Sequence, residues 1–169
     1  AQIARVRGAA RTVGIAGGPE KCALATDTFG FDACLDYKSE GWTDGLADAL
    51  PRGVDVHFEN VGDEMLALAM SHLNLYGRVV LCGLAAHYHG GPPAMTSVGM
   101  IVGKRAQLMG LVVYDYYDRW DAFRGEIAPH VKSGAIRYVH DEVHGLEQAG
   151  ALMERLVRGK NVGKAVVTL

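Results

Sequence analysis

Cysteine is scarce in this chain, which contains only Cys22, Cys34 and Cys82, and no two of them form a C-x-x-C pair. This pattern supports neither a zinc knuckle nor a disulfide framework, so we expect buried, reduced thiols, as in a cytoplasmic protein. His87 and His89 lie close together, but no cysteine or carboxylate stands at ligand spacing from them. The sequence therefore predicts no metal site.

Long apolar runs and clusters of positive charge are also missing. No apolar stretch reaches the roughly 18 residues needed to cross a bilayer, and no basic-then-apolar signal sequence opens the chain. The formal charge is −2, and the lysines and arginines are scattered. We therefore expect a globular protein with neither a membrane nor a nucleic acid as its partner.

Glycine, in contrast, is abundant, with 22 residues among 169. Glycine suits tight turns between strands and helices because it adopts positive φ at little cost. Short β-rich segments are expected at residues 11–16, 33–37, 54–59, 77–82 and 107–113. Helical segments are expected between and around them, at residues 1–7, 20–28, 45–50, 64–73, 100–104 and 117–132. This alternation predicts an α/β fold with a doubly wound, Rossmann-like parallel sheet.

The last part of the chain has a different pattern. Gly134 is a plausible boundary, followed by a strand at residues 136–139, an amphipathic helix at 146–157 and a strand at 164–169. We expect a cofactor-binding domain over residues 1–134 and a returning segment over residues 135–169. The opening residues already have a mid-helix pattern without a cap, which suggests that something upstream has been removed.

In an open α/β sheet, ligands bind beyond the carboxyl ends of the strands. The second strand of an NAD-binding sheet usually ends in an Asp or Glu that binds the adenosine ribose. In this chain the corresponding place, after the strand predicted at residues 11–16, is occupied by Gly17 and Gly18. Lys21 follows one turn later. Small glycines and a cation fit the 2′-phosphate of NADP, although a plain turn with a solvated lysine explains these residues equally well.

Three further strand ends carry weaker signals. Tyr37 and Lys38 could flank adenine or a phosphate, and Asn60 could hydrogen-bond ribose or nicotinamide groups. The segment from Cys82 to Tyr88 has small residues that would let the backbone approach a cofactor. Each of these signals alone has an ordinary structural explanation, but together they describe one dinucleotide site.

Six segments carry a family resemblance: VGIAGGPEKC, FDACLDYKSE, GVDVHFENVG, GRVVLCGLAAHY, GLVVYDY and GKNVGKAVV, in this order. They closely resemble the leukotriene B4 dehydrogenase/prostaglandin reductase-like branch of the medium-chain dehydrogenases. Members of this branch are zinc-independent, NADP-dependent alkenal/one double-bond reductases. They have a further strand, a glycine-rich A-x-x-G-x-x-G-type loop and a catalytic domain before the region that this chain resembles. We therefore expect a truncated cofactor-binding part, inactive in isolation, whose tail packs on the catalytic lobe.

The resemblance also implies a role for each matching position. Lys21 would contact the NADP 2′-phosphate, Tyr37 would flank the adenosine phosphate side, and Asn161 would reach the cofactor from the tail. Tyr88 would place a hydroxyl near the substrate as the catalytic residue. The expected cofactor-binding residues are Gly17, Gly18, Lys21, Tyr37, Asn60, Cys82, Gly83, Leu84, Ala85, Ala86, His87, Leu111, Val112, Val113 and Asn161.

The implied reaction is conjugate reduction of an α,β-unsaturated ketone or aldehyde. NADPH gives hydride to the β-carbon, and the resulting enolate is protonated at the α-carbon without a metal. We also expect a homodimer. A quinone oxidoreductase of the same superfamily is a close alternative, a zinc alcohol dehydrogenase is a weaker one, and a non-catalytic NADP-binding module represents another class.

Overall fold

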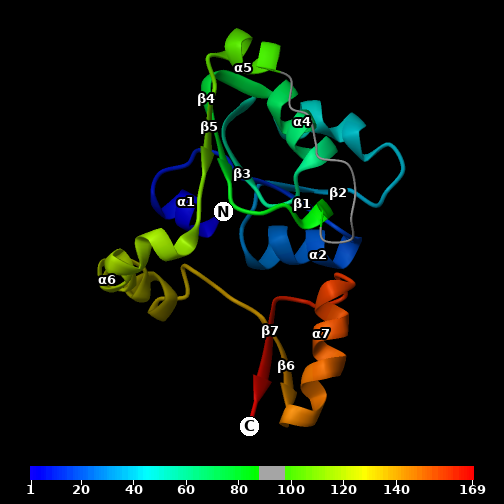
Figure 1. Cartoon of the computed structure of the whole chain (residues 1–169), viewed down its shortest axis with the longest axis vertical. Helices are drawn as coiled ribbons and strands as arrows, with labels where there is room; N and C mark the ends of the chain where they lie inside the picture. The colour runs from blue at the N-terminus through cyan, green and yellow to red at the C-terminus, as the bar shows by residue number, and fades with distance from the viewer. Residues whose placement is uncertain (88–97) are drawn as a thin grey trace. The chain divides into compact units, whose positions relative to one another are not determined.

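The structure is a computed structural model that describes residues 1–87 and 98–169 (Figure 1). The chain forms two compact units, one made of residues 1–49 and 121–169 and the other of residues 50–120. No helix in the described part of the chain is long and apolar enough to cross a membrane. The domain boundary that the sequence predicts at residue 134 stays a prediction.

The first unit contains a pair of parallel strands, β1 (Val13–Ala16) and β2 (Ala33–Asp36). Between them the chain forms α2 (Pro19–Ala23), which continues into a π-helical segment (Leu24–Thr28). This strand–helix–strand arrangement is the one predicted from the sequence. It brings the carboxyl ends of β1 and β2 to the same edge of the sheet.

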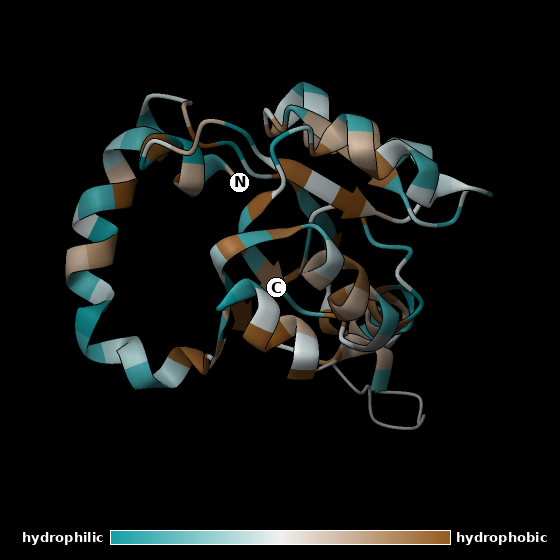
Figure 2. Ribbon diagram, turned by 90° about the horizontal axis from the view of Figure 1, so that it is seen from above, coloured by the Kyte–Doolittle hydropathy of each residue, from teal (hydrophilic) through white to brown (hydrophobic). Residues whose placement is uncertain are grey.

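The same unit also contains the helices α1 (Gln2–Val6), α3 (Leu46–Ala49) and α6 (Trp120–Lys132), of which α6 begins one residue before the unit boundary. A 3₁₀ turn (Trp42–Gly45) precedes α3, and another (Val113–Arg119) leads into α6. Hydrophobic and hydrophilic residues alternate along α6 (Figure 2). Its Ile127 is 8% exposed, so α6 buries part of its apolar face.

The tail of the chain forms a parallel pair, β6 (His140–His144) and β7 (Lys164–Thr168), connected by a 3₁₀ turn (Leu146–Gln148) and α7 (Ala149–Val157). Figure 1 shows α7 alongside both strands. The tail helix was predicted correctly, apart from its first turn. The strand predicted at residues 136–139 is wrong, because β6 begins only at residue 140.

The second unit contains a three-stranded parallel sheet in the order β3 (Val54–Glu59), β4 (Leu73–Leu81), β5 (Gln107–Gly110). The crossover helices are α4 (Asp63–Ser71) and α5 (Val98–Lys104), and a 3₁₀ turn (Ala85–His87) follows β4. The core of this unit comprises Leu66, Met70, Leu73 and Val79. Parallel strands alternating with helices confirm the predicted α/β class.

Candidate functional site

Gly17 is the residue that shapes the carboxyl end of β1. A Cβ atom at this position would lie 2.9 Å from the Tyr37 ring and hydroxyl and 2.9 Å from Cε of Lys38. These distances are shorter than ordinary contacts between heavy atoms, so the missing side chain gives Tyr37 and Lys38 their space. Sequence reasoning selected Gly17 and Tyr37 separately, and the structure brings them into contact.

Lys21 lies on α2, one turn beyond this glycine pair, and is half-buried. Its Nζ donates a hydrogen bond of 2.5 Å to the carbonyl of Gly159, in the loop that follows α7. The same loop contains Asn161, whose Nδ2 donates to the carbonyl of Gly163 at 2.8 Å. The returning tail therefore contacts Lys21, while the Asn161 side chain closes its own turn, and the contact between Asn161 and the cofactor stays a prediction.

Asp36 at the end of β2 is a site residue that sequence reasoning missed. Its carboxylate accepts hydrogen bonds from the backbone N–H of Gly18 at 2.7 Å and of Lys38 at 3.0 Å. These hydrogen bonds, that from Gly18 above all, hold the pKa of the Asp36 carboxyl below its usual value. The sequence shows only that an acid stands directly before Tyr37 and Lys38. It does not show that this acid accepts a hydrogen bond from Gly18.

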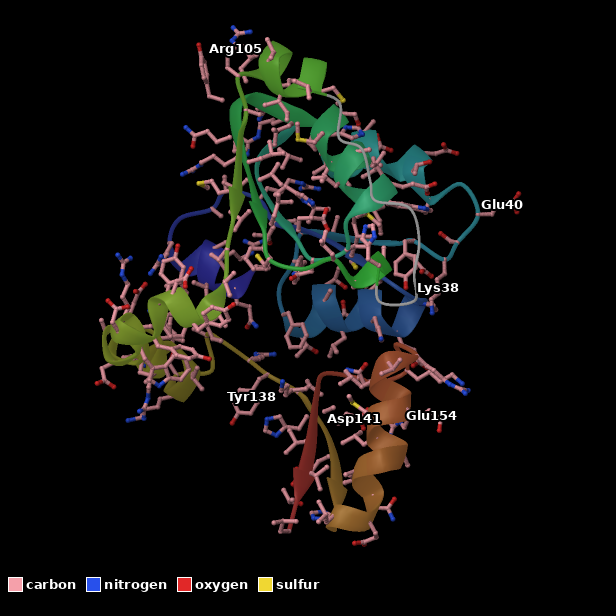
Figure 3. The ribbon with its side chains drawn as sticks, viewed as in Figure 1. Lys38, Glu40, Arg105, Tyr138, Asp141 and Glu154 are labelled. Carbon is pink, nitrogen blue, oxygen red and sulfur yellow. The ribbon has the colours of Figure 1, made fainter. Side chains whose placement is uncertain are left out.

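The residues around Gly17 fit a phosphate-bearing ligand. Lys21 and Lys38 provide two ammonium groups, and Lys38 Nζ lies 5.9 Å from the centre of the Tyr37 ring (Lys38 is labelled in Figure 3). Asp36 is the nearby acid, and two backbone N–H groups already bind its carboxylate. The Gly18 N–H is therefore occupied, and the groups that could bind a 2′-phosphate here are the ammonium groups of Lys21 and Lys38.

Glu59 organises the corresponding strand end in the second unit. It is 1% exposed, and its carboxylate accepts the N–H of Val61 at 2.5 Å and of Gly62 at 2.9 Å. His57 Nε2 lies 2.8 Å from the other carboxylate oxygen. Burial by itself would raise the pKa of the Glu59 carboxyl, but the hydrogen bonds from His57, Gly62 and Val61 outweigh it and lower the pKa.

The loop after β4 is joined to the loop after β3 by backbone hydrogen bonds. The carbonyl of Glu59 accepts the N–H of Cys82 at 2.9 Å and of Gly83 at 3.3 Å, and the carbonyl of Asn60 accepts the N–H of Ala85 at 2.9 Å. A Cβ on Gly83 would lie 3.2 Å from both oxygens of Asn60. The structure therefore gathers Asn60 and the predicted segment from Cys82 to His87 at one strand edge. Burial, followed by the charge of Glu59, raises the pKa of the Cys82 thiol.

The last group of predicted residues follows β5. Leu111 continues the strand direction by donating its N–H to the carbonyl of Leu81 at 2.8 Å. Val112 and Val113 come next and are 42% and 61% exposed. Tyr88, the residue predicted to be catalytic, lies outside the described residues.

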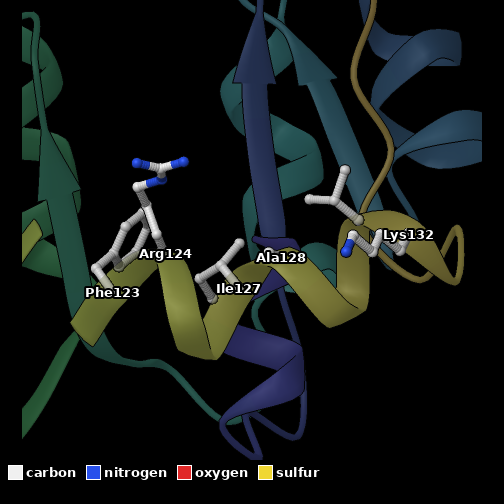
Figure 4. A pocket seen from close by; sticks show the side chains of 6 residues that line it. Phe123, Arg124, Ile127, Ala128 and Lys132 are labelled. Carbon is white, nitrogen blue, oxygen red and sulfur yellow. The ribbon is translucent and has the colours of Figure 1, made fainter. Parts of the chain in front are cut away.

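Two shallow hollows in the first unit lie away from these strand ends. One is a groove of about 310 Å³ along α6, lined by Phe123, Arg124, Ile127, Ala128, Val131 and Lys132 (Figure 4). The other, of about 320 Å³, is lined by residues of α1, the π-helical segment and the turn at Gly134. Neither contains a residue predicted to bind cofactor, so the candidate site rests on the strand ends. Among the described residues, no group of three or more His, Cys, Asp or Glu could hold a metal ion.

Comparison with known sequences gives consistent matches. Residues 1–128 match the family described as zinc-binding dehydrogenase. The chain is 36% identical over 173 residues to the NADPH-dependent curcumin reductase of Escherichia coli, covering 98% of this chain and 50% of that protein. It is also 36% identical over 157 residues to the 2-alkenal reductase (NADP(+)-dependent) of Nicotiana tabacum, covering 92% of this chain and 46% of that protein.

A solved structure agrees with these sequence matches. CurA from Vibrio vulnificus, crystallised in complex with NADPH, superposes with a TM-score of 0.90 and 36% identity. The match covers 99% of this chain and 51% of that protein. The chain thus spans about half the length of the relatives that it matches.

Proposed function

Because the chain belongs to the zinc-binding dehydrogenase family, we propose that it is the cofactor-binding part of an NADPH-dependent oxidoreductase. Its reaction is reduction of the C=C bond of α,β-unsaturated ketones and aldehydes, without a metal. The observation that carries the proposal is the space at Gly17, directly after β1. The side chains of Tyr37 and Lys38, which follow β2, occupy this space, and Lys21 lies one helical turn beyond it. This arrangement suits a 2′-phosphorylated adenosine, because no acid follows β1 directly in the sequence and the nearby Asp36 carboxylate is already bound by the N–H groups of Gly18 and Lys38.

The residues have separate tasks in this proposal. Lys21 and Lys38 neutralise the 2′-phosphate, and Tyr37 flanks the adenosine. Asn60, the segment from Cys82 to His87, and Leu111 to Val113 line the remainder of the cofactor, with Asn161 approaching from the tail. A bound nicotinamide cofactor supplies the hydride in such enzymes.

Substrate activation is assigned to Tyr88. Its hydroxyl would donate a hydrogen bond to the oxygen that gains negative charge as the double bond is reduced. A small-molecule enone or enal, a homodimer and a cytoplasmic location complete the proposal. The relatives named as curcumin and 2-alkenal reductases support the substrate class.

The first experiment is a calorimetric titration of the folded chain with 2′-phospho-AMP and, in parallel, with AMP. We expect 2′-phospho-AMP to bind at least about tenfold more tightly, because only it engages the two lysines. Lys21→Ala should abolish this preference, whereas Lys104→Ala, which removes a similarly half-buried lysine on α5, should leave it intact.

Equal binding of the two nucleotides by a folded chain would remove the NADP assignment. A second measurement separates the reactions that share this cofactor: NADPH oxidation by the whole oxidoreductase, of which this chain is proposed to be a part, is followed with a small 2-alkenone and with a quinone. Turnover of the quinone alone would replace the enone reductase with a quinone oxidoreductase. Preference for 2′-phospho-AMP without turnover of either acceptor would favour a non-catalytic binding module.

A further inference from the structure

Two of the three cysteines face each other in the first unit. Cys22 lies on α2 and Cys34 on β2, and their sulfur atoms are 2.8 Å apart, with the Cys34 thiol donating to Cys22. Both are free thiols and both are half-buried, so a small oxidant can reach them. The third cysteine, Cys82, belongs to the other unit.

We propose that Cys22 and Cys34 form a reversible disulfide when the protein meets a peroxide, and that this bond links α2 covalently to β2. A disulfide has a sulfur–sulfur distance of about 2.05 Å, so the two side chains need to approach by less than about 1 Å. Gly14 on the neighbouring strand β1 packs beside this pair: a Cβ there would lie 3.4 Å from the Cys34 sulfur and 3.1 Å from the Phe31 ring.

The chemistry proceeds in two balanced steps. The Cys22 sulfur, which accepts the hydrogen bond in the pair, attacks one peroxide oxygen, and the O–O bond breaks to give a Cys22 sulfenic acid and water. The Cys34 sulfur then attacks the Cys22 sulfur, the S–O bond breaks, and a second water leaves. The two thiols are oxidised and the peroxide is reduced. A dithiol such as dithiothreitol reverses the reaction by exchange.

The raised pKa of the Cys34 thiol argues against Cys34 as the first residue to be oxidised. Burial first, and the hydrogen bond to Cys22 next, raise the pKa of Cys34 to about 12. A thiol that stays protonated is a poor first target for peroxide, because the thiolate is the reactive form. Cys34 therefore acts as the resolving partner, and the Cys22 sulfenic acid beside it is its target.

Oxidation also reaches the proposed ligand site, and this part of the inference rests on the proposed function. Cys22 follows Lys21 directly on the same short helix, and Lys21 Nζ is held at the Gly159 carbonyl. Drawing α2 toward β2 shifts Lys21 from the position that it has in the dithiol form. We expect 2′-phospho-AMP to bind about threefold or more weakly to the oxidised protein.

The test uses the full chain, treated with hydrogen peroxide and analysed by intact mass and by non-reducing peptide mapping. We expect the loss of two hydrogen masses, a cross-linked peptide pair containing Cys22 and Cys34, and full reversal by dithiothreitol. The loss should persist in Cys82→Ser, the matched control, and disappear in Cys22→Ser and in Cys34→Ser. Peptide mapping of the unmutated chain decides the question even if one of these variants does not fold.

Addition of oxygen without loss of hydrogen, or a bridge that involves Cys82, would overturn the disulfide. Equal affinity of the oxidised and reduced proteins for 2′-phospho-AMP would overturn its coupling to the ligand site. Failure of the proposed function looks different: the reduced protein would then not bind 2′-phospho-AMP at all, while the mass result would stand.

Discussion

Two strand ends in this chain use an acidic side chain to hold the following loop, but in different surroundings. At the end of β2, Asp36 accepts backbone N–H groups from Gly18 and Lys38. At the end of β3, Glu59 accepts backbone N–H groups from Val61 and Gly62. Asp36 is half-buried next to the exposed Tyr37 and Lys38, whereas Glu59 is 1% exposed.

The same hydrogen-bonding pattern therefore has two consequences. A buried carboxylate that satisfies several donors is difficult to replace, because each donor left behind stays desolvated and unpaired. A partly solvated carboxylate is replaced more easily, because water can satisfy the freed donors, and its charge acts on the nearby lysines. We infer that Glu59 mainly stabilises the second unit, while Asp36 mainly adjusts the electrostatics of the proposed phosphate site around Gly17.

The largest effect is expected for Glu59→Ala. Removing the carboxylate leaves the N–H groups of Val61 and Gly62 and the His57 ring without their buried acceptor, so the free energy of unfolding should fall by about 3 kcal/mol. Urea denaturation measures this change. Glu59→Gln keeps an acceptor oxygen and should lose less, while Glu40→Ala, on an exposed loop (Figure 3), should change stability by less than about 0.5 kcal/mol. A Glu59→Ala protein as stable as the unmutated chain would show that the two acids are equivalent.

A smaller effect is expected for Gly17→Ala at the other strand end. The new methyl group would press on Tyr37 and Lys38, and both side chains would have to move away. Affinity for 2′-phospho-AMP should fall about tenfold in calorimetry, with little change in stability, because the displaced atoms are the ends of long side chains. Gly110→Ala on β5, where a Cβ meets nothing within 4 Å, is the matched control. Unchanged affinity would separate Tyr37 and Lys38 from the ligand site.

The smallest effect is expected for Asp36→Asn. The amide oxygen can still accept from Gly18, but the negative charge beside the lysines is lost, so 2′-phospho-AMP should bind about twofold more tightly. Calorimetry at low and high salt provides the check, since the gain should shrink as salt screens the charges. Asp48→Asn on α3 serves as the control. Weaker binding by Asp36→Asn would mean that loop structure outweighs charge here.

Sequence reasoning predicted what depends on local pattern. The alternation of β-rich segments, glycine turns and helical segments located β1, α2 and β2. The ends of the predicted strands then identified Gly17, Lys21 and Tyr37 as candidate site residues. Sequence reasoning missed the hydrogen bonds by which Asp36 and Glu59 hold the loops after their strands. It also missed the contact between the sulfur atoms of Cys22 and Cys34. These features depend on which backbone groups and side chains come together in space, and no local pattern encodes them.

The error in the tail has a specific cause. The β-branched and aromatic residues within 136–139 looked like a strand, yet Ile136 donates its N–H to the carbonyl of His130 and belongs to the turn that ends α6. Gly134, with φ of +77°, permits that turn. The strand forms instead at residues 140–144, where pairing with β7 outweighs intrinsic preference.

The hydrogen bond between Lys21 and Gly159 has a consequence for the timing of folding during synthesis. It joins positions 138 residues apart, and the unit that contains it is assembled from both the early and the late part of the chain. Residues 50–120 are contiguous and can begin to fold as soon as they leave the ribosome. The hydrogen bond that holds Lys21, in contrast, forms only after residue 159 has been translated, so this lysine of the proposed ligand site takes its final position late in synthesis.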